Sequence, residues 1–131
     1  MALNNDFAPT FADLAGFTPP RFVDGRSLLP LLSARPPTGW RTAFLVEHRR
    51  SKEEYAYARI IPDYDAVRTA NHLYVEYEIG EKELYNLSKD PYELTNRYAS
   101  ADAALRSELR ARLNTLRDCT GPECRRAEDG G

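Results

Sequence analysis

The histidine at position 48 and the charged residues around it are the first candidates for chemistry in this sequence. His48 ends the predicted strand 44–48 and directly precedes the basic loop Arg49-Arg50-Ser51-Lys52. An imidazole beside guanidinium groups can bind an anionic group at the end of a strand. The alternative is that His48 belongs to a solvated polar loop. The second histidine, His72, follows the predicted turn Ala70-Asn71, and we expect it to be an ordinary first residue of a strand.

The two cysteines, Cys119 and Cys124, are separated by Thr120-Gly121-Pro122-Glu123. A Gly-Pro turn can bring the two thiols close together, so we expect a small-loop disulfide. Free thiols and a metal site are the alternatives, but two cysteines make a poor zinc site because zinc usually takes more ligands from the protein. A disulfide indicates an oxidising compartment and therefore an exported chain.

The sequence contains no motif of a nucleophilic or phosphate-binding site. Gly-x-Ser-x-Gly is absent, and Gly25-Arg26-Ser27 lacks the further glycines and the lysine of a phosphate-binding loop. Tyrosines of the predicted strands can stack on sugars, although half-buried sheet positions are the more ordinary interpretation. These tyrosines are Tyr55, Tyr57, Tyr64, Tyr74 and Tyr77. The residues by themselves indicate an exported domain without a visible catalytic apparatus.

Composition narrows the classes of partner. The 131 residues include 18 Lys and Arg against 20 Asp and Glu, which gives a formal net charge of −2. This balance gives no electrostatic case for nucleic acid or an anionic membrane as the main partner. No apolar run approaches the roughly 20 residues of a membrane-spanning helix, and the first residues do not form a signal peptide. We therefore expect no nucleic acid and no membrane span.

Three regions must position the candidate residues. Residues 1–40 predict short helices and a Pro-rich link, and residues 119–131 predict a disulfide turn and a polar tail. Residues 41–118 predict antiparallel strands, with a three-stranded meander over 64–87, followed by an amphipathic helix within 100–118. Each region has its own composition, and we expect the three to be separate parts of the chain.

The amphipathic helix decides the expected fold class. Its apolar stripe consists of Leu105, Leu109, Leu113 and Leu116. Such a stripe needs an apolar sheet face to cover it, and the predicted meander supplies one. We therefore expect an α+β fold, in which a small antiparallel sheet of about four strands packs on a C-terminal amphipathic helix.

Several short segments, in a fixed order, carry a resemblance to a known family. Two groups of segments are involved: Asn5–Thr10, Asp13–Gly16, Asp24–Leu32 and Trp40-Arg41 before Leu45–His48, and then Ala66–Thr69, Tyr74–Tyr77, Glu83–Leu87 and Asp90–Asn96. The first group resembles the end of the large domain and the next strand in the sulfatase family. The second group resembles the C-terminal subdomain of that family, and Asp90–Asn96 is its most recognisable signature. The ending Leu116–Arg125 resembles the glucosamine-6-sulfatase branch, so the match covers nearly the whole chain, from about residue 4 to 126.

The resemblance implies a large α/β domain followed by a smaller domain with a four-stranded antiparallel sheet on a long helix. It also implies hydrolysis of sulfate esters by a formylglycine made from a C/S-x-P-x-R motif, with calcium on Asp and Asn side chains of the large domain. This sequence has no such motif, so we assign no catalytic and no metal residue to it. Residues 1–40 then correspond to the helical end of the large domain.

The same resemblance leads us to expect the C-terminal part of a sulfatase, inactive alone. The expected partners are the missing N-terminal domain and a sulfated glycan or aryl sulfate, and the expected location is secreted, periplasmic or lysosomal. In the family, loops of the small domain lie over the active-site mouth, so we expect His48, Glu47 and Arg68 to contact the substrate. The alternative for Arg68 is a pair with a carboxylate across the sheet.

Other interpretations are a stand-alone module that binds anionic sugars, a module that docks on a separate catalytic subunit, and a part of a phosphatase or phosphonate hydrolase from the same superfamily. The apolar residues within 3–33 favour a part of a larger enzyme, because a self-sufficient module has no use for them. These residues are Phe7, Phe11, Leu14, Leu28, Leu29 and Leu31.

Overall fold

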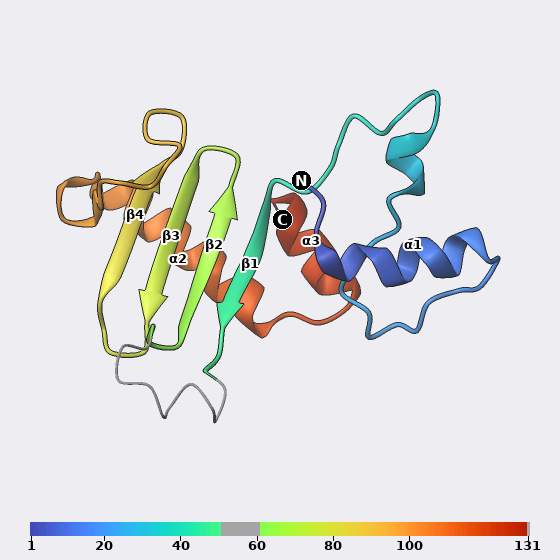
Figure 1. The fold of residues 1–131 in the computed structure, drawn as a ribbon, viewed down its shortest axis with the longest axis horizontal. Coiled ribbons are helices and arrows are strands. Elements are labelled where there is room, and N and C mark those ends of the chain that lie inside the picture. Colours follow the sequence, from blue (N-terminus) through green and yellow to red (C-terminus); the bar gives the residue numbers. More distant parts are fainter. Residues whose placement is uncertain (51–60, 131) are drawn as a thin grey trace. The chain divides into compact units, whose positions relative to one another are not determined.

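The computed structural model describes residues 1–50 and 61–130, and these form two compact units (Figure 1). Unit 1 consists of Met1–Ala43 together with Asp118–Gly131, and unit 2 is Phe44–Arg117. The residues after 118, expected to be a separate tail, therefore belong to the same unit as the first 43 residues. The predicted strand positions Tyr55 and Tyr57 lie outside the described residues.

Unit 2 is built on a four-stranded sheet with the strand order β1-β2-β3-β4. The strands are β1 (Ala43–His48), β2 (Tyr64–Thr69), β3 (His72–Tyr77) and β4 (Lys82–Asn86). Both β2–β3 and β3–β4 are antiparallel pairs, which confirms the predicted meander. At the first turn, Thr69 Oγ1 accepts the N–H of His72 at 2.9 Å and that of Asn71 at 3.3 Å.

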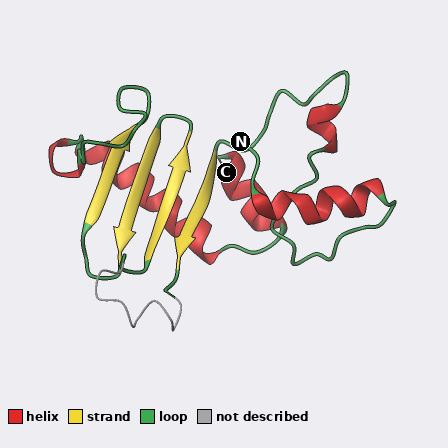
Figure 2. Ribbon diagram, viewed as in Figure 1, coloured by secondary structure: helices red, strands yellow, loops and turns green. Residues whose placement is uncertain are grey.

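Helix α2 (Ala103–Asp118) lies across one face of this sheet (Figures 1 and 2), which confirms the expected α+β fold. Asp102 caps its start, because its Oδ1 accepts the N–H of Ala104 at 2.8 Å. The predicted stripe supplies the buried side chains of the helix, Leu109, Leu113 and Leu116. A 3₁₀-helix, η4 (Tyr98–Ser100), precedes α2.

Helix α2 packs on the sheet face that carries Asp65 and Glu76. Arg117 of α2 donates to Asp65 Oδ2 at 2.8 Å and to Glu76 Oε2 at 3.2 Å, so the helix lies on the side of these two carboxylates. Side chains alternate along a strand, so Val67 and Tyr74 share this face with them. The register places Val67 opposite Tyr74 and Tyr74 opposite Leu84, and all three side chains are buried. The phenol ring of Tyr74 therefore supplies apolar area to the face that α2 covers.

Unit 1 contains η1 (Asn4–Asp6), α1 (Phe7–Leu14), η2 (Leu29–Leu32) and α3 (Pro122–Asp129). The segment expected to be a polar tail is thus mainly the helix α3. Its helical start follows from Pro122 in the first turn, and its end from Gly130 with φ 109°. Within the described residues, no helix is long and apolar enough to cross a membrane.

Candidate functional site

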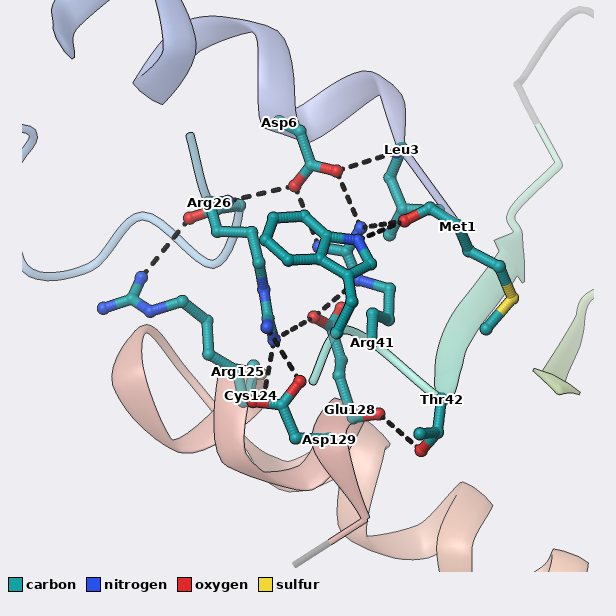
Figure 3. Close-up of polar contacts among 12 residues, drawn as sticks. Met1, Leu3, Asp6, Arg26, Arg41, Thr42, Cys124, Arg125, Glu128 and Asp129 are labelled. Atoms are coloured by element: carbon teal, nitrogen blue, oxygen red, sulfur yellow. Dashed lines mark hydrogen bonds and ion pairs between the residues drawn. The ribbon is translucent and has the colours of Figure 1, made fainter. Parts of the chain in front are cut away.

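Arg41 is a buried charged residue of unit 1 and lies between two carboxylates (Figure 3). Its Nη1 and Nη2 donate to the two oxygens of Asp6 at 2.7 and 2.8 Å, and its Nε donates to Glu128 Oε2 at 2.7 Å. The side chains of Arg41 and Asp6 are both 0% exposed. Paired guanidinium–carboxylate bonds of this geometry are among the strong hydrogen bonds of proteins.

A second arginine continues this cluster. Arg26 donates from Nη2 to Glu128 Oε2 at 3.0 Å and from Nη1 to Asp129 Oδ1 at 2.7 Å. Its guanidinium carbon lies 5.1 Å from the centroid of the Trp40 ring, which is a cation–π distance. Glu128 therefore binds both Arg26 and Arg41, as Figure 3 shows.

The backbone around Asp6 explains why the cluster forms here. The Asp6 carboxylate accepts the N–H of Leu3 at 2.8 Å and the N–H of Arg26 at 3.0 Å. The neighbouring Gly25 has no room for a side chain, since a Cβ there would lie 2.1 Å from the carbonyl oxygen of Asn5. The Asp6 side chain makes no capping hydrogen bond to the first turn of α1, because the buried guanidinium and two loop N–H groups take its oxygens.

The charges in this cluster reinforce one another. Burial works against ionisation of Asp6, but hydrogen bonds from Arg41, Arg26 and Leu3 outweigh it and lower the pKa of Asp6. Burial likewise opposes the charge of Arg41, and its bonds to Asp6 and Glu128 raise the pKa of its guanidinium. Both groups are therefore ionised across the physiological range. All three nitrogens of the Arg41 guanidinium donate within unit 1, and its side chain is 0% exposed, so Arg41 joins parts of unit 1 and is not accessible to a ligand.

The predicted disulfide is confirmed. Cys119 and Cys124 are bonded, with Cα atoms 4.9 Å apart. Gly121 between them has φ 55°, and a Cβ at that position would lie 2.2 Å from the carbonyl oxygen of Arg21. The disulfide therefore closes a turn that requires glycine at the start of α3.

His48, the first sequence candidate, ends β1 and is partly buried. Its ring stacks on Tyr64, with centroids 5.3 Å apart and planes at 25°, and Tyr64 meets Tyr77 edge-on at 5.4 Å. The Nε2 atom of His48 is buried and has no hydrogen-bond partner among the described residues. His48 is therefore held by aromatic contacts on the sheet face opposite to α2.

The other two candidates lie away from His48. Glu47 alternates to the other face of the strand, is 54% exposed and contacts Arg49 at 3.2 Å. Arg68 shares a sheet face with Tyr64, four residues further along β2, which corresponds to roughly 13 Å. The Nη1 atom of Arg68 is 3.0 Å from Oε1 of Glu93, which belongs to the loop after β4. The structure thus places the three candidates at separate positions, and Arg68 has a carboxylate partner.

The sheet face opposite to α2 carries a hollow of about 370 Å³ that includes Arg68. Its lining is largely apolar and includes the aromatic rings of Tyr64, Tyr77 and Tyr85. Burial and the hydrogen bond to Glu83 raise the pKa of Tyr85 to about 12. Burial and the neighbouring Glu83 also raise the pKa of Tyr77. Tyr77 and Tyr85 are therefore neutral hydrogen-bonding groups at physiological pH and are not bases.

The α2 side of the sheet carries a charged cluster around Glu76. Burial opposes its charge, but hydrogen bonds from Tyr74, Lys82 and Arg117 prevail and lower the pKa of Glu76 to about 2. Lys82 Nζ lies 2.9 Å from Glu76 Oε1. This cluster joins β3, β4 and α2.

The described residues do not fit the metal that the family resemblance implies. Over residues 1–50 and 61–130, no group of three His, Cys, Asp or Glu side chains could hold a metal ion. The sequence also lacks Cys-x-Pro-x-Arg and Ser-x-Pro-x-Arg. We therefore derive no reaction step through calcium or formylglycine from this chain.

Sequence reasoning missed Arg41, Glu128 and Glu76. The partners of Arg41 are 35 and 87 positions away in the chain, so no local spacing reveals them. The arginines of α2 only weakly indicated that a carboxylate such as Glu76 lies opposite them, because any exposed helix face can carry arginines.

Comparison with known proteins adds what the geometry leaves open. The family model described as "N-sulphoglucosamine sulphohydrolase, C-terminal" matches residues 1–119. The N-acetylglucosamine-6-sulfatase of Capra hircus is 31% identical, over 95% of this chain and 27% of that protein. The chain therefore spans about a quarter of the length of the relatives it matches.

Two solved structures are similar as well. One, determined in complex with its substrate D-glucosamine-2-N,6-O-disulfate, is 31% identical with a TM-score of 0.72, over 83% of this chain and 22% of that one. The phosphonate monoester hydrolase of Agrobacterium radiobacter is 34% identical with a TM-score of 0.69, over 86% of this chain and 24% of that one.

Proposed function

The chain belongs to the family of N-sulphoglucosamine sulphohydrolase C-terminal domains, and from this we propose that it is the C-terminal part of an exported sulfatase. The complete protein hydrolyses sulfate esters of a glucosamine-type sugar. The support for this substrate is the similarity to an N-acetylglucosamine-6-sulfatase and to a structure bound to a disulfated glucosamine. The disulfide between Cys119 and Cys124 supports export.

The observation that carries the proposal is the surface of α1. Phe7, Phe11 and Leu14 are 55%, 65% and 64% exposed, and the rings of Phe7 and Phe11 stack at 6.4 Å. A run of exposed large apolar side chains on one helix marks a surface that is covered by another part of a protein. We propose that the large sulfatase domain covers it, and that this domain supplies the formylglycine and calcium.

Within this function, we propose that His48 and Arg68 reach the substrate from the sheet face opposite to α2, and that Glu47 reaches it from the end of β1. The unpartnered Nε2 of His48 supports a hydrogen bond to a sugar hydroxyl or sulfate oxygen. Arg68 is about one third exposed, so its guanidinium can contact an anion while it stays paired with Glu93.

The test is an assay of sulfate release from N-acetylglucosamine 6-sulfate, with the chain alone and with the product of the longer coding region. We expect release only with the longer protein. Turnover by the pure chain, or none by a longer protein that contains C/S-x-P-x-R, would contradict the proposal. His48→Ala in the longer protein should raise KM more than it lowers kcat, while Glu81→Ala, in an exposed turn, should change neither.

A phosphonate monoester hydrolase is the second candidate, favoured by the 34% identity to the Agrobacterium radiobacter enzyme. The same longer protein should be assayed with a phosphonate monoester and with the sulfate ester. A kcat/KM at least tenfold higher for the sulfate ester supports the sulfatase, and the reverse ratio supports the second candidate.

A further inference from the structure

A hollow of about 550 Å³ lies in unit 2 between the loop after β4 and the start of α2. We call it the β4 hollow. Leu84, Leu94 and Leu105 form the apolar part of its lining, and Lys89 and Arg97 bring basic side chains. Its volume is in the range of pockets that hold small molecules, about 300–1,000 Å³.

The loop that forms its wall is held by hydrogen bonds. Asn96 Oδ1 accepts the N–H of Leu84 at 3.1 Å, and the N–H of Arg97 donates to the carbonyl oxygen of Leu84 at 2.8 Å. The Asp90 carboxylate accepts the N–H groups of residues 94 and 95 at 3.1 and 2.8 Å. The wall is thus formed before any ligand arrives, which lowers the entropic cost of binding.

The charge pattern singles this hollow out. Among the described residues of unit 2, Lys89 and Arg97 are the basic side chains without any partner. Each of the other described Lys and Arg side chains of unit 2 interacts with another group. These residues are Arg49, Arg50, Arg68, Lys82, Arg106, Arg110, Arg112 and Arg117. Both unpaired cations line the β4 hollow.

The carboxylates of the same lining are already used. Asp90 binds the loop N–H groups, and Asp102 accepts the N–H groups of residues 104 and 105 at the start of α2. The hollow therefore offers free cationic donors, while its anionic acceptors have partners. His72, also in the lining, adds an imidazole with no partner in the described structure.

We propose that the β4 hollow binds an anionic sugar unit, with Lys89 and Arg97 on its carboxylate or sulfate and the leucines under its ring. Charge-assisted hydrogen bonds from an ammonium and a guanidinium suit both oxyanions. The anion preference follows from the hollow, and the choice of a sugar rests on the proposed function. The loop that contains Asp90–Asn96 would then take part in glycan binding, since it lines the β4 hollow.

The test is a titration of the chain, followed through the amide signals of residues 84–105, with glucosamine 6-sulfate, glucuronate and uncharged N-acetylglucosamine. At least one anionic sugar should shift these signals, and N-acetylglucosamine should not. Lys89→Ala and Arg97→Ala should each weaken Kd about three- to fivefold, as expected for exposed charge pairs. Arg35→Ala, at an exposed arginine of unit 1 without a partner, is the matched control and should leave Kd unchanged.

Binding of the sulfated sugar alone or of glucuronate alone supports the site and identifies the group it holds. Equal binding of N-acetylglucosamine, unchanged Kd in both variants, or no shift at millimolar concentrations would overturn it. Failure of the longer protein to release sulfate would contradict the proposed function and leave the binding result intact, because the titration requires no turnover.

Discussion

At the residue scale, unit 1 depends on a few buried charges. A guanidinium at 0% exposure is tolerated because two carboxylates and a carbonyl surround it. The consequence is asymmetric, since removing one partner leaves the other charges buried and uncompensated.

Arg41→Met should lower the free energy of unfolding of unit 1 by about 3–5 kcal/mol, because Asp6 and Glu128 would lose their buried partner. Urea unfolding followed by Trp40 fluorescence measures this change. Arg35→Met, at an exposed position, should stay within about 0.5 kcal/mol of the unchanged chain. Equal losses in both variants would rule out a special role for Arg41.

Glu76 should give unit 2 an acid-dependent stability. Its pKa is about 2 in the folded chain against an ordinary value of 4.5, so its contribution is fully present above pH 4.5 and disappears as the pH falls toward 2. The lowered pKa corresponds to roughly 3 kcal/mol. Glu76→Gln should remove most of the slope of unfolding free energy against pH in this window.

The control for this measurement is Glu81→Gln, at an exposed turn position, which should keep the slope of the unchanged chain. An unaltered slope in Glu76→Gln would show that other carboxylates cause the acid dependence.

At the element scale, some parts of the fold could be predicted from the sequence and others could not. The three-stranded meander over 64–87 could be predicted, because turn residues separate its strands and local alternation marks them. Helix α3 was missed because its apolar content is low, and its stability comes from Arg26 and Arg41, which are far away in the sequence. The candidate site could be predicted only as a list of residues, since spacing does not reveal which sheet face α2 covers.

The disulfide should stabilise α3 specifically. The double variant Cys119→Ala with Cys124→Ala should cost about 2 kcal/mol, as the loop-closure estimate gives for so short a loop. Amide hydrogen exchange should become faster in α3 and at Thr42, whose N–H donates to the carbonyl oxygen of Glu128 at 2.8 Å. Exchange in β3 and β4 of unit 2 should not change, and faster exchange there would contradict a local effect.

At the scale of the whole molecule, the exposed aromatic side chains of α1 govern the behaviour of the isolated chain. Phe7→Ser with Phe11→Ser should leave the free energy of unfolding within about 1 kcal/mol, because both side chains are already mostly in solvent. The same change should reduce self-association, measured by light scattering, because it breaks up an apolar patch.

Tyr92→Ser is the control, since Tyr92 is 81% exposed but lies in unit 2. It should leave self-association unchanged. A large loss of stability in the α1 variant would show that these rings pack within the chain and do not face a missing domain.

Unit 1 consists of two stretches of the sequence, before and after unit 2, and this has a consequence for synthesis on the ribosome. Asp6 and Arg41 leave the ribosome before any residue of unit 2, whereas Glu128 and Cys124 follow after all of unit 2 has been made. A domain generally folds as a unit once its residues are available. Unit 2 can therefore complete its sheet before Glu128 becomes available to pair with Arg41.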